Sequence, residues 1–104
     1  FDALSSIIFD EIDTGVSGEV ANLMSEMMLS MSKKRQIISV THLPQIASKA
    51  NTHFKVFKSE NNNRTTSEIK RLEQSERVEE IAKMLSGKTV TETSINNAME
   101  LLSQ

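Results

Sequence analysis

The sequence predicts a mixed α/β fold with a parallel βαβ unit at its core, and three features of the chain lead to this prediction. Residues 6–13 begin as an apolar run and end in acids, the pattern of a buried strand that reaches the edge of a sheet. Residues 37–42 are a second strand-like run, and about thirty residues separate the two strand ends, the length of one βαβ unit. The intervening residues 17–34 repeat apolar side chains at helical spacing.

The helix predicted between the two strands is amphipathic. Ser17 can cap its start, because a serine hydroxyl accepts a hydrogen bond from a free amide of the first turn. The predicted apolar face consists of Val20, Leu23, Met24, Met27, Met28 and Met31. A right-handed crossover through this helix makes the two strands parallel, with both carboxyl ends on one edge of the sheet.

Asp10 and Glu11 stand at the end of the first strand, where open α/β folds place their ligands. A Walker B element is built in this way: the first acid holds Mg²⁺, and the second polarises the water that attacks the γ-phosphate. For this stretch alone, a strand that ends in a solvated acidic turn is the simpler interpretation. His42 ends the second strand, and the parallel arrangement brings it toward the acids.

The next part of the chain predicts a β-hairpin. Residues 52–59 and 65–72 have the pattern of antiparallel strands at the edge of the sheet, joined by a polar turn. We expect Phe54 and Val56 to point inward and His53 to face solvent. A candidate DNA-binding face consists of Lys55, Lys58, Arg64, Lys70 and Arg71. Lysine on an edge strand more often serves to prevent aggregation, and this is the simpler interpretation.

Two helices are predicted to close the chain. The first opens at Ser75 and stops at Gly87, and its apolar face consists of Val78, Ile81, Ala82 and Leu85. The second begins near Thr91, and its apolar side consists of Ile95, Ala98, Met99 and Leu102. Both patterns are typical of helices that pack on a core.

Composition narrows the classes of function. The chain has 104 residues, of which 38% are hydrophobic, and a formal net charge of −2, which gives no overall attraction to DNA. The absence of cysteine excludes a disulfide framework and a cysteine-based metal site. No apolar run approaches the length of about twenty residues that a membrane span requires. We expect an aliphatic core rich in methionine.

Two motifs together resemble the RecN family of bacterial DNA-repair proteins, ATPases related to the SMC and ABC families. The first is residues 7–18, Ile-Ile-Phe-Asp-Glu-Ile-Asp-Thr-Gly-Val-Ser-Gly, and the second is residues 39–47, Ser-Val-Thr-His-Leu-Pro-Gln-Ile-Ala. The likeness continues through residues 79–87 and 98–102 and covers nearly all of the chain. It implies a cytoplasmic, nucleoid-associated bacterial protein that acts in double-strand-break repair and recombination.

The resemblance implies a role for each motif. Asp10 is the Mg²⁺-associated acid, Glu11 is the catalytic base, and His42 is the switch histidine that contacts the γ-phosphate. The D-loop region, which meets a second ATPase head, corresponds to Asp13, Thr14, Gly15, Ser17 and Gly18. ATP and Mg²⁺ are the implied cofactors of the intact head. A second head and DNA are the implied partners of the full-length protein, with no membrane.

Two segments that such a head requires do not occur in this sequence. One is the phosphate-binding loop Gly-x-x-x-x-Gly-Lys-Ser/Thr, and the other is the Ser-Gly-Gly-Glu signature of ABC-type heads. We therefore expect residues 1–104 to be the C-terminal part of an ATPase head domain, a partial P-loop NTPase lobe that holds half of a composite site. We expect it to be inactive alone, and to self-associate through the apolar residues of its first strand.

Two other interpretations stay open. Another SMC-like or ABC-type head shares the acidic pair and the histidine, but is expected to differ in the Thr-Gly-Val-Ser-Gly segment. A non-catalytic protein-interaction domain would use the acids only to end a strand.

Overall fold

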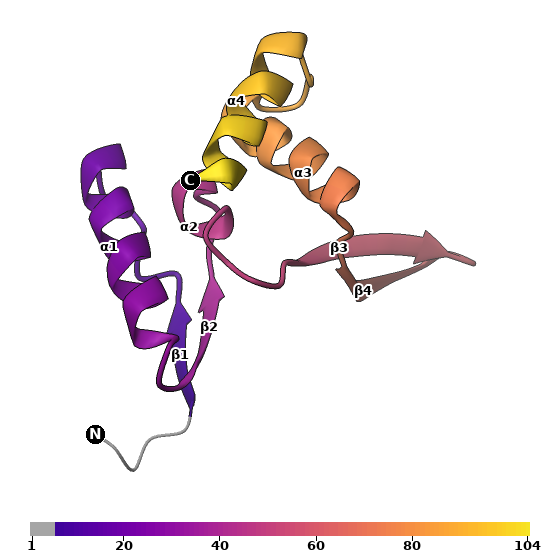
Figure 1. The fold of residues 1–104 in the computed structure, drawn as a ribbon. Helices are drawn as coiled ribbons and strands as arrows, with labels where there is room; N and C mark the ends of the chain where they lie inside the picture. The colour runs from indigo at the N-terminus through magenta and orange to yellow at the C-terminus, as the bar shows by residue number, and fades with distance from the viewer. Residues whose placement is uncertain (1–5) are drawn as a thin grey trace.

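The computed structural model describes residues 6–104, and Figure 1 labels its elements. In chain order they are β1 (Ser6–Asp10), α1 (Gly18–Met31), β2 (Gln36–Val40), α2 (Pro44–Ala47), β3 (Phe54–Asn61), β4 (Arg64–Arg71), α3 (Gln74–Ser86) and α4 (Glu92–Ser103). The predicted βαβ unit, hairpin and closing helices are confirmed, whereas the short helix α2 was not predicted. Within the described residues, no helix is long and apolar enough to cross a membrane.

The strands β1 and β2 form a two-stranded parallel sheet, as predicted. Their register pairs Ser6 with Gln36 at one end and Asp10 with Val40 at the other. The crossover between them is α1, which lies beside the strand pair and contacts α2 (Figure 1). Both strands therefore end on the same edge of this sheet, next to α2.

Helix α1 begins where the sequence predicts, because the Ser17 hydroxyl accepts a hydrogen bond from the Val20 amide at 3.3 Å. Its buried stripe differs from the predicted apolar face. The buried residues are Ala21, Ser25 and Met28. Three residues of the predicted face are exposed instead, namely Val20, Leu23 and Met27. The stripe that is covered is rich in small side chains, which let a neighbouring element approach the helix closely.

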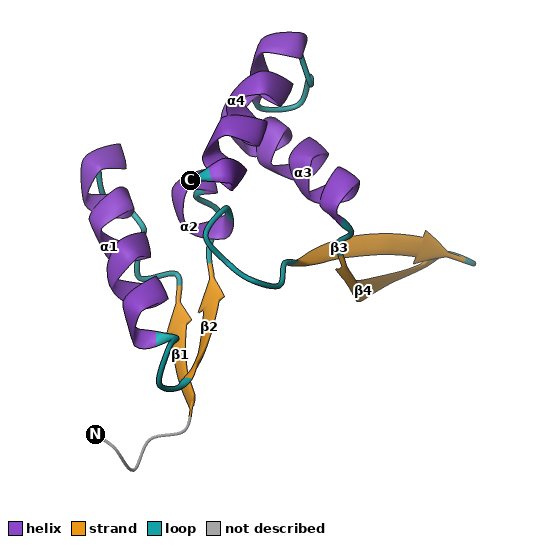
Figure 2. Cartoon of the chain, in the orientation of Figure 1, coloured by secondary structure: helices purple, strands orange, loops and turns teal. Residues whose placement is uncertain are grey.

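The hairpin of β3 and β4 is confirmed, but its predicted position at the edge of the parallel sheet is wrong. Within residues 6–104 the hairpin is a separate two-stranded antiparallel sheet, set apart from the parallel pair in Figure 2. Its register runs from Phe54 opposite Arg71 to Asn61 opposite Arg64. The segment that contains α2 lies between the two sheets along the chain. No ladder hydrogen bonds join the two sheets within the described residues.

The two faces of the hairpin are the reverse of the prediction. Phe54 and Val56 are 54% and 70% exposed, whereas Lys55 and Phe57 are half-buried. An ion pair joins this face to α3, in which Lys55 Nζ lies 2.8 Å from a carboxylate oxygen of Glu80. The Lys55 face therefore lies toward α3, and the opposite face is uncovered within residues 6–104.

The predicted basic face of the hairpin is likewise not a single surface. Lys55 pairs with Glu80, and Lys70 pairs with Glu76, so both cations are neutralised by α3. Arg71 lies opposite Phe54, on the other face of the sheet, and Arg64 stands at the far end of the hairpin. The hairpin therefore presents separated cations and no continuous basic stripe.

Helices α3 and α4 pack on each other and on α2 to form the core. The buried apolar residues of this cluster are Ala47, Ile81, Ala82 and Ala98. The expectation of a methionine-rich core is wrong, because Met28 is the one methionine among the buried hydrophobic residues of the described chain. Helix α3 is capped by Glu73, whose side chain pairs with the first turn, and not by Ser75, whereas the predicted stop at Gly87 and start at Thr91 are confirmed.

Arg77 connects α3 to the end of α2. One terminal nitrogen of its guanidinium, Nη2, donates hydrogen bonds to the carbonyls of Ala47, Ser48 and Ala50 at 3.0, 3.2 and 2.7 Å. These carbonyls are at the negative end of α2, where a cation is favourable. Burial lowers the pKa of the Arg77 guanidinium from its ordinary value. The side chain thus fixes α2, and with it the loop after β2, against the helical core.

We expect Arg77→Met to destabilise the chain by about 1.5–3 kcal/mol, because hydrogen bonds from a charged donor to three carbonyls are lost. Urea unfolding followed by circular dichroism measures this change. Arg64→Met, on the exposed end of the hairpin, is the matched control and should change the free energy of unfolding by less than about 0.5 kcal/mol. Equal effects of the two substitutions would contradict the assigned role.

Candidate functional site

The candidate site is the edge of the parallel sheet where β1 and β2 both end. Asp10 is paired with Val40, and the amide of Glu11 donates to the Val40 carbonyl at 2.9 Å. Thr41 and His42 follow Val40 directly, so the acidic segment and the histidine segment leave the sheet side by side. The parallel pairing predicted from the sequence thus brings these two motifs to one place.

Glu11 has an unusual backbone conformation at this edge. Its φ is 52°, in the left-handed region that non-glycine residues rarely adopt. The Glu11 carbonyl accepts a hydrogen bond from the Thr14 hydroxyl at 3.0 Å, which stabilises the tight turn that follows. Strained backbone of this kind concentrates at functional sites, where the surrounding structure holds it in place. Both Asp10 and Glu11 are exposed and can be reached by a ligand.

Asp13 lies inside the protein and links the two segments. It is 1% exposed, and its Oδ2 accepts a hydrogen bond from the Thr41 hydroxyl. The Thr41 oxygen in turn accepts from the Leu43 amide at 3.0 Å, so the hydrogen bonds bracket His42 on both sides. The other carboxylate oxygen, Oδ1, is buried and has no hydrogen-bond partner among the described residues. Asp13 therefore ties the loop after β1 to the loop after β2.

The other residues of the predicted D-loop follow the buried Asp13 along the chain and lead into α1. Thr14 and Gly15 are exposed, and Gly15 has a φ of 79°, which a glycine adopts without strain. Ser17 caps α1, as described above. A β-carbon added at Gly18 would lie 3.5 Å from Nε2 of Gln45, so the start of α1 passes close to α2. The loop presents its exposed turn outward, and its ends are fixed on both sides.

His42 occupies the short connection between β2 and α2. Its side chain is exposed, and the buried Pro44 that starts α2 follows two residues later. The structure thus places the histidine at the same sheet edge as Asp10 and Glu11, on a connection held by Thr41.

The side chains at this edge of the sheet supply only some of the ligands that a divalent cation needs. Asp10 and Glu11 are two exposed carboxylates, and Mg²⁺ usually takes one or two carboxylates together with waters and substrate phosphates. Within residues 6–104, no group of three or more metal-ligating side chains forms a complete site. Asp10 and Glu11 alone therefore supply only part of the ligand shell of such a cation.

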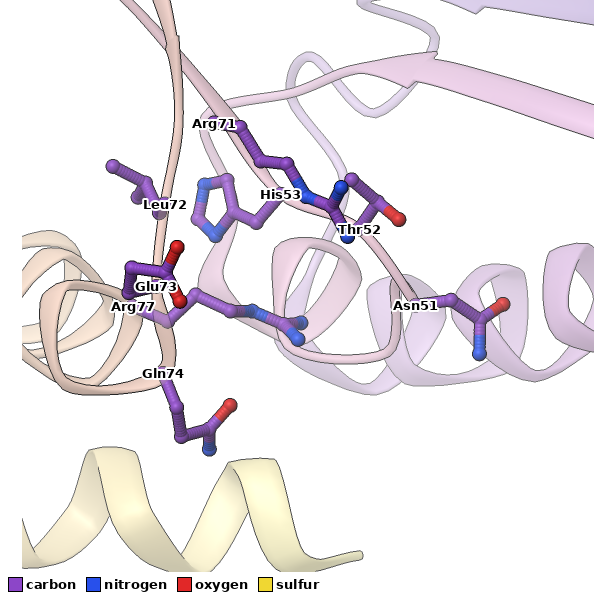
Figure 3. Close-up of a pocket in the computed structure, with 8 residues that line it drawn as sticks. All are labelled: Asn51, Thr52, His53, Arg71, Leu72, Glu73, Gln74 and Arg77. Carbon is purple, nitrogen blue, oxygen red and sulfur yellow. The ribbon is translucent and has the colours of Figure 1, made fainter.

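Two residues that matter to the structure, Thr41 and Arg77, were not singled out as candidates in the sequence. Thr41 is adjacent to His42, but nothing in a strand pattern indicates that its hydroxyl reaches a carboxylate 28 residues away in the chain. Arg77 and His53 line a separate polar pocket, shown in Figure 3, which contains no residue of the acidic strand end. His53 is half-buried, and the expectation that it faces solvent is wrong.

No protein-family model matches the chain, but individual proteins do. The DNA repair protein RecN of Rickettsia conorii is 48% identical over 97 residues, which cover 93% of this chain and 18% of that protein. RecN of Bacillus subtilis is 45% identical over 101 residues, covering 97% of this chain and 18% of that protein. The chain is homologous to a segment of RecN. It spans about a fifth of the length of these relatives.

The RecN of Deinococcus radiodurans gives a similar match, with 44% identity over 97 residues, 93% of this chain and 17% of that protein. A solved structure from a study of ATP-driven dimerization and DNA-stimulated activation of SMC ATPases resembles this chain with a TM-score of 0.64. The superposition covers 84% of this chain and 51% of that one, at 17% sequence identity. At this identity the likeness shows the fold alone, a mixed α/β arrangement that this chain shares with that structure.

We expect Thr41→Val to cost about 1–3 kcal/mol of stability, because it removes the donor to a buried carboxylate without changing the volume of the side chain. Chemical denaturation measures the loss. Thr41→Ser keeps the hydroxyl and is the control that should retain most of the stability. If Thr41→Val keeps the stability of the wild type, the hydrogen bond to Asp13 does not contribute. A loss of stability in Thr41→Ser would instead assign the contribution to the Thr41 methyl group.

Proposed function

We propose that this chain is the part of a RecN-like ATPase head that carries the Walker B acids and the switch histidine, in a protein that acts in DNA repair. The observation that carries the proposal is the meeting of the Asp10 and Glu11 strand end with the Thr41 and His42 strand end at one sheet edge. The RecN proteins that match the chain over 93–97% of its length support the same assignment. The head acts in ATP hydrolysis, and the chain contributes half of the site.

In this proposal the two acids have different tasks. Asp10, the last residue of β1, holds the Mg²⁺ that accompanies ATP, and this ion supplies charge stabilisation to the phosphates. Glu11 orients and deprotonates the attacking water as a general base. The left-handed backbone at Glu11 turns the chain directly after Asp10, so that consecutive residues can serve different parts of the substrate.

His42 and the D-loop complete the contribution of this chain. His42 contacts the γ-phosphate and senses its presence. The loop of Thr14, Gly15, Ser17 and Gly18 meets a second head, and Asp13 holds that loop in position from within, because its carboxylate is buried against Thr41. The loop that meets the partner and the histidine that meets the nucleotide are thus joined by one hydrogen-bonded unit.

The remaining partners belong to the full-length protein. The solved SMC structure that shares this fold comes from work on ATPases that dimerise with ATP and are activated by DNA. By analogy we propose that the RecN-like heads pair around ATP, and that the full-length protein binds DNA.

In the full-length protein, Glu11→Gln should reduce ATP turnover by roughly 10²- to 10⁴-fold while nucleotide still binds, because the amide keeps the shape of the side chain but cannot accept a proton. His42→Ala should slow hydrolysis by about 10²- to 10³-fold through loss of a phosphate contact. Asp10→Asn should instead weaken binding of Mg²⁺ and nucleotide. Single-turnover kinetics with a nucleotide-binding assay separates these effects.

Glu26→Gln is the control for this series, because Glu26 is an exposed acid on α1 outside the site. It should leave binding and turnover unchanged. Wild-type turnover in Glu11→Gln would remove Glu11 from its proposed role, and loss of nucleotide binding in the same variant would assign it to binding and not to catalysis.

The chain of 104 residues alone should show no ATP turnover above background. Its two exposed carboxylates bind Mg²⁺ only weakly without a loop that cradles the phosphates. A coupled-enzyme ATPase assay and a nucleotide titration test this. Robust turnover that disappears in Glu11→Gln would mean that these residues form a complete site.

A further inference from the structure

A polar pocket of about 380 Å³ lies where the segment after α2 meets the junction of β4 with α3. Its lining includes Asn51, Thr52, His53, Arg71, Glu73 and Arg77. In Figure 3, Arg71 and Arg77 extend toward the segment of Asn51 and Thr52, and the His53 ring lies between the two arginine stems. The pocket is therefore lined by groups that can donate hydrogen bonds from two segments of the chain, residues 51–53 and 71–77.

Several of these donors are not used within residues 6–104. Nδ1 of His53 and Nε of Arg77 are both buried and have no hydrogen-bond partner there. Arg71 is exposed and is absent from the three ion pairs of the described chain. Buried donors without partners cost free energy, so a ligand that accepts hydrogen bonds would be stabilised by them.

The charges around the pocket favour an anion. Arg71 and Arg77 are positive, and Glu73 is the single acid among the lining residues. The Glu73 side chain is already engaged, because it accepts a hydrogen bond from the backbone of the first turn of α3. Glu80 also acts on His53, but it forms an ion pair with Lys55. The start of α3 at Gln74 adds the positive end of a helix dipole to the same side.

The geometry also favours a particular kind of anion. A carboxylate offers two oxygens in one plane, whereas the donors here come from different segments and directions. A tetrahedral oxyanion presents oxygens to several sides at once, and the several N–H donors of arginine guanidinium groups match phosphate oxygens. The polar lining is unsuited to an apolar ligand.

We propose that this pocket binds a phosphate group, held by Arg71 and by the unpartnered nitrogens of His53 and Arg77. The phosphate comes from inorganic phosphate or from a nucleic-acid backbone, which share this chemistry. The site is independent of the proposed ATPase function, because none of its residues belongs to the Walker B or D-loop segments.

The test is a titration of the ¹⁵N-labelled chain with inorganic phosphate, followed by amide chemical shifts, with sodium chloride at matched ionic strength as the reference. We expect phosphate-specific shifts at Asn51, His53 and Arg71. Arg71→Gln should weaken the apparent affinity roughly three- to tenfold, since a charged donor at an exposed site is lost. Arg64→Gln makes the same change of charge at the other end of the hairpin and should leave the affinity unchanged.

A second arm identifies the source of the phosphate. If a nucleic-acid backbone is the source, a short single-stranded oligonucleotide shifts the same amides at lower concentration than inorganic phosphate, and Arg71→Gln weakens its binding more than Arg64→Gln does. If inorganic phosphate is the source, the oligonucleotide leaves the pocket amides unchanged while phosphate shifts them. Either result supports a phosphate site.

The titration of His53 gives an independent measurement. Burial lowers the pKa of His53 below its ordinary value of 6.5, the positive charge of Arg77 lowers it further, and Glu80 raises it. A bound dianion favours the protonated imidazole, so the pKa of His53 should rise in sulfate relative to chloride. Sulfate is the probe here because its charge stays constant over this pH range. Arg71→Gln should reduce the rise, and Arg64→Gln should not.

Two results would overturn the proposal. One is a set of shifts that sodium chloride reproduces at the same ionic strength. The other is an equal loss of affinity in Arg71→Gln and Arg64→Gln, which would mean that phosphate senses only the overall charge. Circular dichroism of each variant establishes that it is folded before the comparison is made.

Discussion

The parallel register of β1 with β2 is the constraint on which the candidate site depends. Because Asp10 is paired with Val40, the chain must turn at Glu11 on one strand and at Thr41 on the other, at the same height on the sheet. Side chains alternate along a strand, so a shift of one residue would place the opposite set of side chains at this edge. The distance between the acids and the histidine is therefore set by backbone pairing and not by the loops themselves.

The buried carboxylate of Asp13 is the second constraint on the candidate site, and its burial costs free energy. A carboxylate that is 1% exposed loses its hydration, and this loss is offset only if hydrogen bonds replace it. Thr41 supplies one such bond, while Oδ1 has no partner within residues 6–104. A buried polar link of this kind stabilises the protein less than an apolar contact would, but it fixes the position of one loop relative to the other. We therefore interpret Asp13 as a determinant of loop geometry more than of stability.

The sequence allowed the local structure to be predicted well and the tertiary contacts less well. The strand end at Asp10, the cap at Ser17 and the stop at Gly87 follow from short-range rules, because apolar runs, hydroxyl caps and glycine act within a few residues. Strand β2 ends at Val40, two residues before the predicted end at His42. The contact of Thr41 with Asp13, and that of Arg77 with the end of α2, join residues about thirty positions apart in sequence. No periodicity encodes them, so they emerged only from the structure.

The wrong predictions of the buried faces of the hairpin and of α1 share a physical cause. An apolar pattern indicates that a face is suited to burial, but it does not indicate that residues 6–104 contain the element that covers it. Val56 and Leu23 lie on predicted apolar faces but are 70% and 61% exposed. The hairpin contacts α3 through Lys55, and α1 packs through Ala21. The covered face of each is therefore not the face that carries Val56 or Leu23. The contacts within residues 6–104 therefore account for the side chains that are covered, Lys55 and Ala21, but provide no cover for Val56 and Leu23.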